Sequence, residues 1–401
     1  MKKLFFILFC SCVCFFAGCT SSDGKTGNID GIFLTDFMEV SIIVNENYSH
    51  FDNKNIDPHA LTDKYLSQIE NCKSREEYIK ILFQYFAELE NDHSLMFFEQ
   101  YYGINISLQL IQGRLFIDKI FDDNLRNMLN EKDEIIEIDN LPIEQWIEQN
   151  IRYSSGSTEA SRIKRTIWSI TSGPFQTSRI FLINANNNIS KIVIDFAELR
   201  THPLLLAMEP IQSRIINEIA GYLSIKFMFG DISDFVNEYL KVFHLPYLII
   251  DLRENIGGNS DFSEEIASYL IQSYSIASVS GRRIEPNENY YRGTLILLVG
   301  PKTASAAESF VLDIKENGNG IIVGSETSGD TGNNPREFVS NLEIIFTIPT
   351  RKPPQISSGG FPMEGVGIPP DYFVEMTVHD YQNGIDTVLN FVLENIFKNG
   401  I

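Results

Sequence analysis

The spacing of apolar residues changes along the chain and divides it into regions. From residue 29 to about residue 100, apolar side chains recur at helical intervals, as at Tyr78, Leu82 and Tyr85. Asp57-Pro58 is typical of a helix start, because proline is tolerated in the first turn of a helix. Residues 29–100 are therefore predicted to form a small N-terminal helical domain.

Residues 101–188 have a different pattern, with short strand-like runs such as Leu115–Ile117. The runs lead to Asp133–Asn140, which resembles a strand of a PDZ module with Lys132-Asp133 in place of the usual Gly-Asp. Such a module binds an extended peptide by adding it to a sheet edge. Tyr102–Ile104 is either the carboxylate loop of this groove or a short turn before a strand. We expect a PDZ-like module and a connector in this region.

Residues 189–401 contain apolar strand runs separated by helical stretches. The main strand runs cover residues 221–227, 248–252, 294–299, 321–323 and 342–347. Strands that alternate with helices favour a mixed, largely parallel sheet. The expected fold class is therefore α+β and multidomain, with residues 189–401 as a mixed αβ core.

The first 19 residues, MKKLFFILFCSCVCFFAGC, carry two lysines and an apolar run that is too short for a spanning helix. The segment resembles a bacterial lipoprotein signal, with cleavage before Cys19 and acylation of that cysteine. A plain secretory peptide and an uncleaved anchor are the alternatives. Residues 20–28 are rich in Ser, Gly and Asp and are predicted to be a tether. The protein is then expected to be extracytoplasmic, in the bacterial cell envelope, and held to the membrane by its lipid.

Composition indicates which partners, cofactors and covalent cross-links are not expected. Removal of the signal and acylation of Cys19 would leave Cys72 alone among five cysteines, so no disulfide framework is predicted. The 53 acidic residues outnumber the 32 basic ones, the net charge is -21, and no basic stretch is suited to phosphate contacts. Nucleic acid is therefore not an expected partner. No cluster of His, Cys and Asp has the spacing of a metal site, so neither a metal nor another cofactor is expected.

One serine lies where a nucleophile would be useful. The strand run 294–299 is followed by Gly300-Pro301, which should end the strand, and then by a bend of small residues around Ser305. A helical stretch follows, and the free N–H groups of its first turn are available to stabilise an oxyanion. A serine at such a position is also a common N-cap, and the bend alone does not decide between the two roles.

A second segment favours the catalytic role. The buried strand run 248–252 breaks into Glu254–Asn259, where Gly257 and Gly258 let backbone N–H groups face a ligand. In chain order, LIIDLRENIGG, TASAAE and GSETSG resemble segments of the peptidase family of the C-terminal-processing (tail-specific) proteases and the tricorn core protease. ELENDHSLMF, DEIIEIDNLPI, AGYLSIKF and MEGVGIPPD extend the resemblance over most of the mature chain. The resemblance implies a serine peptidase whose core has a spiral ββα arrangement.

The base that would activate Ser305 differs between the branches of this family. A serine hydroxyl needs a group to accept its proton. The C-terminal-processing branch uses a lysine after the glycine of G-x-x-T-x-G, but here Asp330 follows Gly329. The tricorn-like branch uses a histidine, and Asp92-His93-Ser94 matches its segment, so the resemblance implies His93 as general base. In tricorn-type sequences a serine precedes this histidine, whereas here Asp92 does. The sequence therefore does not decide which residues hydrogen-bond to His93. Lys302 is the alternative base.

The remaining site residues also come from the resemblance. Glu364, in MEGVGIPPD, matches an acidic residue of the tricorn-like branch and is expected to orient His93. A glutamate in a Gly/Pro loop is otherwise an ordinary surface residue. The oxyanion hole is expected to use the N–H of Ala306 and one N–H of the Gly257-Gly258 pair.

Together these segments predict an extracytoplasmic serine endopeptidase that cleaves a peptide or protein substrate through an acyl-enzyme on Ser305. The rival interpretation is a catalytically inactive peptide-binding lipoprotein that kept the fold after losing the lysine. A third interpretation is a Ser-Lys hydrolase that uses another lysine, such as Lys302. These interpretations differ in whether residues 93, 305 and 364, which are far apart in the sequence, should meet in space.

Overall fold

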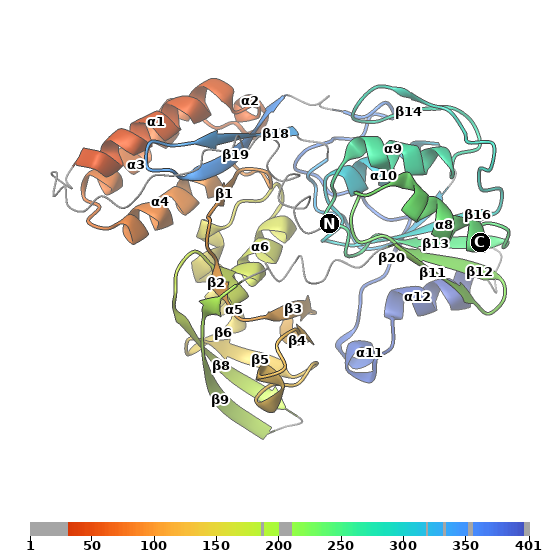
Figure 1. Ribbon diagram of the computed structural model, residues 1–401, viewed down its shortest axis with the longest axis horizontal. Coiled ribbons are helices and arrows are strands. Elements are labelled where there is room, and N and C mark those ends of the chain that lie inside the picture. The colour runs from red at the N-terminus through yellow and green to blue at the C-terminus, as the bar shows by residue number, and fades with distance from the viewer. Residues whose placement is uncertain are drawn as a thin grey trace, which may run out of the picture.

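The computed structural model describes residues 31–185, 188–199, 211–317, 320–331, 334–351 and 356–396. The predicted signal segment, the tether and Cys19 lie outside these residues. No helix within the described ranges is both long enough and apolar enough to cross a membrane. The architecture is mixed α+β and multidomain, as predicted: a first module of helices, a second module with an antiparallel sheet, and a core with a largely parallel sheet (Figure 1).

The first module is built on the helices α1 (Ile32–Asn47), α2 (Phe51–Lys54), α3 (Pro58–Glu70) and α4 (Arg75–Ala87). The predicted start of α3 is confirmed, because the Asp57 carboxylate accepts hydrogen bonds from the N–H groups of His59 and Ala60. Aromatic side chains fill the space between the helices. The Phe37 and Tyr85 rings, for example, meet edge to face with their centroids 5.2 Å apart.

A hairpin from the last third of the chain completes the first module. The strands β1 (Leu95–Phe97), β19 (Ile345–Arg351) and β18 (Asn334–Val339) form an antiparallel sheet in that order, beside the helices (Figure 1). The strand run at residues 342–347 was expected in the core sheet, but β19 packs on the helices instead. The physical reason is burial, because Phe346 is fully buried with its ring centroid 5.2 Å from that of Phe86. The hairpin fixes β1, which directly follows the segment around His93.

The second module is an antiparallel sheet packed against helices. Its strands run in the order β3 (Ile106–Ile111), β4 (Arg114–Ile120), β5 (Glu134–Ile138), β8 (Ser178–Ala185) and β9 (Asn188–Asp195), and β6 (Leu141–Pro142) pairs with β5. The helices are α5 (Ile143–Asn150) and α6 (Glu159–Thr171). Buried apolar side chains from the sheet and from both helices, among them Ile117, Trp146 and Ile170, form one cluster.

The segment before β3 is already paired. β2 (Tyr102–Gly103) forms antiparallel pairs with β7 (Ser172–Gly173) and with β10 (Ala197–Glu198). The next N–H group, that of Ile104, donates to the Thr171 carbonyl at 2.8 Å. This pairing agrees with the alternative of a short element before a strand, because an open carboxylate loop needs unpaired N–H groups.

The core is a six-stranded sheet in the order β11 (Gln212–Ile216), β12 (Ala220–Ser224), β13 (Tyr247–Asp251), β16 (Thr294–Val299), β17 (Gly320–Gly324) and β20 (Tyr372–Phe373). The strands from β12 to β20 are parallel and β11, at the edge, is antiparallel, which confirms the predicted sheet type. Apolar side chains of α8 (Ile232–Val242), α9 (Ser260–Ser268) and α10 (Ala306–Glu316) cover one face, and those of α12 (Thr387–Phe391) cover the other. Because both faces are buried, the central strands read as unbroken apolar runs. A small hairpin of β14 (Ser275–Ile276) and β15 (Arg283–Ile284) follows α9.

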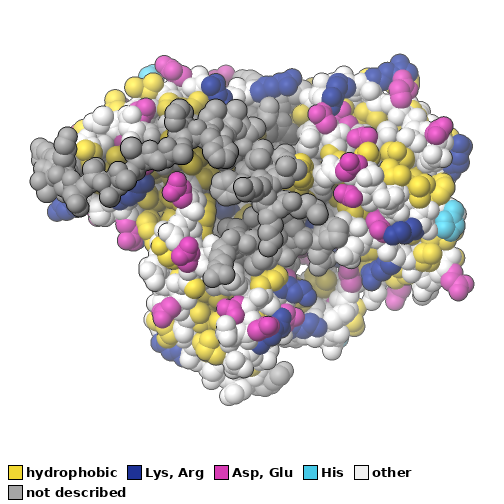
Figure 2. All heavy atoms as spheres, viewed as in Figure 1, with side chains coloured by type: hydrophobic (Ala, Val, Ile, Leu, Met, Phe, Trp, Pro, Cys, Tyr) yellow, Lys and Arg dark blue, Asp and Glu magenta, His cyan; other side chains and the backbone are white. Residues whose placement is uncertain are grey.

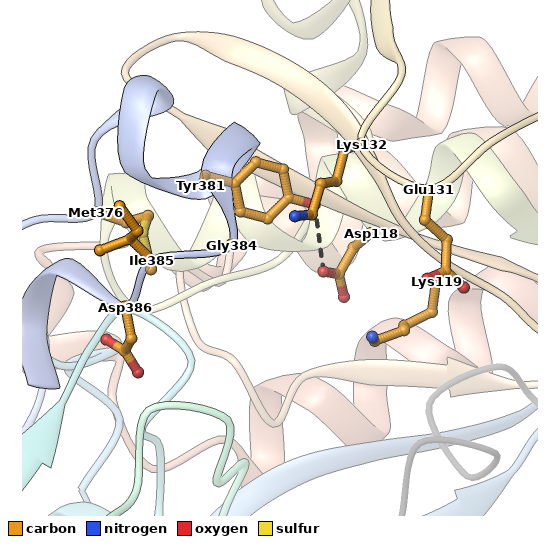
Figure 3. A pocket seen from close by; sticks show the side chains of 9 residues that line it. All are labelled: Asp118, Lys119, Glu131, Lys132, Met376, Tyr381, Gly384, Ile385 and Asp386. Atoms are coloured by element: carbon orange, nitrogen blue, oxygen red, sulfur yellow. Dashed lines mark hydrogen bonds between the residues drawn. The ribbon is translucent and has the colours of Figure 1, made fainter.

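The C-terminal segment links the core to the second module. In α11 (Val378–Asn383), the Tyr381 hydroxyl lies 3.3 Å from a carboxylate oxygen of Asp118 in β4. A cavity of about 240 Å³ remains between the two parts (Figure 3). Asp386 lines this cavity, and its carboxylate accepts two hydrogen bonds of 2.7 Å from Arg253, which lies just before the glycine turn. The second module and the glycine turn thus contact the same C-terminal segment.

Charged side chains are mixed on the surface. On the face drawn in Figure 2, lysine and arginine side chains are scattered among acidic and apolar ones rather than gathered into a patch. Some of the exposed basic side chains pair with carboxylates, as Lys64 does with Glu88 and Arg282 with Glu264. Among the described residues visible on this face, acidic and apolar side chains separate the basic ones.

Candidate active site

Ser305 caps the N-terminus of α10, directly after the bend that follows β16. Its backbone has φ 54° and ψ -123°, a conformation that costs a residue with a side chain about 1 to 3 kcal/mol. Strained turns between a strand and a helix expose a nucleophile at the edge of a sheet. The Ser305 N–H donates to Oε2 of Glu308 at 3.1 Å, and this bond helps to hold the bend. The predicted position of Ser305 at the first turn of a helix is confirmed.

Glu308 joins the serine bend to the segment after β17. Its fully buried carboxylate accepts hydrogen bonds from the Thr327 hydroxyl at 2.5 Å and from the N–H groups of Gly329 and Asp330 at 2.7 and 2.8 Å. Burial raises the pKa of Glu308 to about 8, although these donors favour its charged form. Sequence reasoning gave Glu308 no role, because a glutamate inside an apolar helix shows no partner until the fold is known.

His93 reaches Ser305 from the first module. Its Nε2 lies 3.5 Å from Ser305 Oγ, a long contact of the kind found before substrate binds. The His93 carbonyl accepts a 2.7 Å hydrogen bond from the Thr347 hydroxyl in β19, and its N–H donates to Oδ1 of Asn91 at 2.9 Å. Two residues named from the sequence, Ser305 and His93, are therefore brought together.

The other nitrogen of the His93 ring faces Asp330. Nδ1 lies 2.7 Å from Oδ2 of Asp330, whose side chain is 3% exposed. Burial lowers the pKa of His93, but the neighbouring Asp330 carboxylate outweighs it and holds the pKa above its ordinary value of 6.5. Asp330 was noticed in the sequence only as the residue that stands where the family lysine is missing. Its contact with His93 depends on tertiary structure and has no local signal.

Glu364 lies near this pair without a recorded contact to the imidazole ring. Its backbone forms an antiparallel bridge with Asp330. Its carboxylate accepts a 3.2 Å hydrogen bond from Asn91 Nδ2 and forms a 3.2 Å ion pair with Lys54 of α2. Burial, together with the charge of Asp330, raises the pKa of Glu364 to about 7. The carboxylate within hydrogen-bond distance of His93 is therefore that of Asp330, whereas the sequence pointed to Glu364.

Lys302, the alternative base, is turned away from the serine. Its ammonium group donates to Gln109 of β3 at 2.9 Å and to the Glu254 carboxylate at 2.7 Å. These bonds connect the serine bend to the second module and to the glycine turn. The structure records no contact between Lys302 and Ser305 Oγ within the residues it describes.

The predicted oxyanion donors lie beside Ser305 but are not equivalent. The Gly257 N–H already donates to Oδ1 of Asn255 at 2.9 Å. Among the residues that the structure describes, the N–H groups of Ala306 and Gly258 donate no hydrogen bond. Gly257 has φ 99°, and a Cβ atom there would lie 2.7 Å from Ser305 Cβ, so a side chain would press on the nucleophile. The geometry therefore leaves Ala306 and Gly258 as the available donors.

Family comparisons agree with this site. The model of peptidase family S41 matches residues 219–374, which include the serine bend, the glycine turn and Asp330. The N-terminal domain of Bacteroidetes S41 peptidases matches residues 110–195, and the tricorn protease C1 domain matches residues 33–87. Residues 219–374 therefore carry a domain of peptidase family S41, and the three matches together identify a serine-type peptidase.

Curated relatives in the family are larger proteins. The tricorn protease of Thermoplasma acidophilum is 26% identical over 175 residues, which is 41% of this chain and 16% of that protein. The tricorn protease homolog of Saccharolobus solfataricus is 26% identical over 198 residues, or 44% of this chain and 17% of that protein. This chain thus spans about a sixth of the length of these relatives.

Solved structures show the same fold over nearly the whole chain. Mature CPAF aligns with a TM-score of 0.75 at 14% identity, covering 94% of this chain and 99% of its own. The photosystem II D1 C-terminal processing protease aligns with a TM-score of 0.51 at 14% identity, covering 86% of this chain and 93% of its own. The S41 fold is therefore not confined to the residues that the family model matches.

Proposed function

We propose that this protein is a serine endopeptidase that cleaves peptide bonds through an acyl-enzyme on Ser305. The observation that carries the proposal is the chain of contacts from Ser305 Oγ to His93 Nε2, at 3.5 Å, and from His93 Nδ1 to Asp330 Oδ2, at 2.7 Å. A nucleophile, a base and a carboxylate in this order form a catalytic triad. The match to the S41 family model and the strained bend at Ser305 support the same assignment.

The proposed reaction uses each of these groups in turn. Neutral His93 accepts the Ser305 proton as Oγ attacks the substrate carbonyl, and the resulting imidazolium is stabilised by the Asp330 carboxylate. His93 then gives the proton to the leaving amine, and the acyl group stays on Ser305. A water molecule, activated by His93 in the same way, attacks the ester and releases the second product. Asp330 keeps Nδ1 protonated, so that Nε2 is free to act as the base.

Backbone N–H groups would stabilise the tetrahedral oxyanion. We assign this role to the unpaired N–H groups of Ala306 and Gly258, with the bonded Gly257 N–H holding the turn. Such a donor contributes about 3 kcal/mol to the transition state. Because both donors come from backbone turns of one sheet, they need no rearrangement as charge develops on the substrate.

The setting of the enzyme is also part of the proposal. We propose that the chain is a lipoprotein acylated at Cys19, extracytoplasmic in the bacterial cell envelope, and that its substrates are peptides or proteins. The support is the N-terminal sequence, with its two lysines, apolar run and Ala17-Gly18-Cys19. The second module is the proposed PDZ-like element, in which β3 is an edge strand packed beside α6, and the core is the proposed spiral ββα element.

The test uses the full chain with a fluorogenic peptide mixture and a fluorophosphonate probe. Wild type should cleave the peptides and be labelled at Ser305. Ser305→Ala should do neither, and His93→Ala should lose about a millionfold in kcat, because serine and base act as one unit. Lys302→Ala should stay active.

Other outcomes separate the rival interpretations. A wild type that binds peptides without cleaving them or reacting with the probe would indicate an inactive peptide-binding lipoprotein. An inactive Lys302→Ala beside an active His93→Ala would indicate a Ser-Lys hydrolase. Either result would overturn the proposed triad.

A further inference from the structure

Helix α6 of the second module brings two cations to the residue before His93. Lys164, whose side chain is 6% exposed, places its Nζ 3.2 Å from Oδ2 of Asp92. Arg165 forms an ion pair with the same carboxylate and donates to the Asp92 carbonyl at 2.9 Å. Asp92 is therefore bound on its side chain and on its backbone by one helix from another module.

The same ammonium group also binds the segment that carries Asp330. Lys164 Nζ donates to the hydroxyl of the fully buried Ser328 at 2.8 Å. Ser328 Oγ in turn donates to Asp92 Oδ2 at 3.4 Å, and its carbonyl accepts a 2.8 Å bond from the hydroxyl of Thr158, the N-cap of α6. One lysine thus joins the residue before His93 to the residue two positions before Asp330.

The two cations favour the charged form of the Asp92 carboxylate. Burial would raise the pKa of Asp92, but Lys164 and Arg165 outweigh it and hold the pKa well below its usual range. A buried carboxylate that loses one of its cations is costly, because the remaining charge is left without full compensation. Asp92 therefore needs both Lys164 and Arg165 as partners in the folded protein.

We propose that Lys164 is a positioning residue, which holds the imidazole of His93 and the carboxylate of Asp330 in register by binding both of their segments. The inference rests on the proposed function, since it concerns the geometry of the proposed triad. It adds that the second module is part of the catalytic apparatus, because His93 comes from the first module and Asp330 from the core. The pair is aligned only while α6 is docked between them.

The size of the expected effect follows from what small displacements cost. A shift of about 1 Å in a catalytic group reduces turnover by roughly 100-fold. Lys164→Met keeps most of the apolar stem but removes both hydrogen bonds of the ammonium group. We expect this variant to lose about 100-fold in kcat with little change in KM, because a side chain that is only 6% exposed offers almost no surface to a substrate.

A spectroscopic signal reports the alignment directly. In the full chain labelled with ¹⁵N-histidine, the proton on His93 Nδ1 should give a far-downfield resonance, because it lies between the ring and the Asp330 carboxylate. The resonance is assigned by its loss in His93→Ala. We expect it to disappear or move upfield in Lys164→Met, a change that a purely structural role for Lys164 would not produce.

The matched control lies on the same helix. Arg162 donates to the carbonyls of Ser154 and Ile151, both within the second module, at 3.3 and 3.2 Å. Arg162→Met therefore removes a partly buried cation of α6 without touching the segments of His93 or Asp330. It should keep the resonance and the wild-type kcat.

Where Lys164→Met does not fold, Ser328→Ala makes the same test, because it breaks the link to the Asp330 segment and leaves the Lys164-Asp92 pair intact. It should weaken or shift the resonance and lower kcat. A normal resonance and normal kcat in the folded Lys164 variant, or in Ser328→Ala, would overturn the inference. A wild type without the resonance, or an Asp330→Asn variant with full activity, would instead overturn the proposed triad.

Discussion

The two sides of the candidate site are built in different ways. Ser305 and the oxyanion donors come from turns that follow β16 and β13, two strands that pair directly in one sheet. His93 and Asp330 come from the first module and from the segment after β17, and α6 of the second module binds Asp92 and Ser328 in these two segments. The serine side is therefore encoded by local sequence, whereas the histidine side exists only after three modules have assembled.

The histidine side therefore depends more strongly on contacts between modules than the serine side does. The bend at Ser305 needs small residues, a strained backbone and one carboxylate from the next helical turn, all within a short stretch. The contact between His93 and Asp330 needs the hairpin of β18 and β19, the ion group of Asp92 and the docking of α6. A substitution that loosens the modules should impair the base before it impairs the nucleophile.

The largest expected effect tests which carboxylate serves His93. Asp330→Asn should lose about 10⁴-fold in kcat, because an amide no longer holds the imidazole in the tautomer that frees Nε2. The acid limb of kcat/KM should also move to lower pH. His93 acts as a base only when it is neutral, so the acid limb follows its pKa. Asp330 raises the pKa of His93 above 6.5, and removal of the Asp330 charge lets that pKa fall.

Glu364→Gln is the matched comparison, because it also replaces a buried carboxylate by an amide. It should change kcat by less than about 10-fold, since Glu364 is one step removed from the ring. It should also destabilise the fold, because Lys54, whose side chain is 9% exposed, would lose its ion-pair partner. The measurements are pH profiles of kcat and kcat/KM and a urea unfolding curve. If Glu364→Gln were the damaging change and Asp330→Asn the mild one, the assignment made from the sequence would hold instead.

The serine side of the site could be predicted from the sequence, and much of the histidine side could not. The strand at 294–299, the break at Gly300-Pro301 and the cap at Ser305 depend on neighbouring residues, and all were placed correctly. The contact of Asp330 could not be read, because it depends on where a distant loop packs. β19 was misplaced for a similar reason. Its apolar run predicts that the strand is buried, but it does not identify the surface that buries it, which here includes Phe86.

The next largest loss of turnover is expected on replacement of Glu308, whose carboxylate bonds to both sides of the site. Glu308→Gln should lose about 100-fold in kcat, because an amide nitrogen would face some of the N–H groups that now point at the carboxylate, and the serine bend and the Asp330 segment would shift apart. Labelling of Ser305 by the fluorophosphonate probe should slow in parallel.

Glu316→Gln is the control for this change. Glu316 lies on the same helix and also holds a loop through its carboxylate, accepting bonds from the Ser358 hydroxyl at 2.8 Å and from the Gly359 N–H at 3.0 Å. That loop carries none of the proposed catalytic groups, so turnover should be unchanged. Equal losses in both variants would show that any carboxylate clamp on α10 matters in the same way, and the special role of Glu308 would be lost.

The smallest expected effect on turnover comes from the remaining buried carboxyl of α10. Asp313 lies on the serine side of the comparison but outside the site, and it accepts a 2.7 Å hydrogen bond from the Ser278 N–H. Burial raises its pKa from 3.8 to about 7. The folded protein therefore keeps this proton over a pH range in which the unfolded chain releases it, and the free energy of unfolding falls as pH rises from about 4 to 7.

Asp313→Asn should remove this fall, because asparagine does not titrate and its carbonyl oxygen can still accept the Ser278 bond. A shift of this size corresponds to about 2 to 4 kcal/mol between the two ends of the range. Urea unfolding of wild type and variant at pH 5 and pH 8 measures it, and the variant should lose less stability at pH 8 while kcat stays the same. An identical pH dependence in both proteins would mean that Asp313 is not the source of the slope. A loss of turnover would show instead that the serine side depends on the whole length of α10, and that it is less local than its sequence pattern indicates.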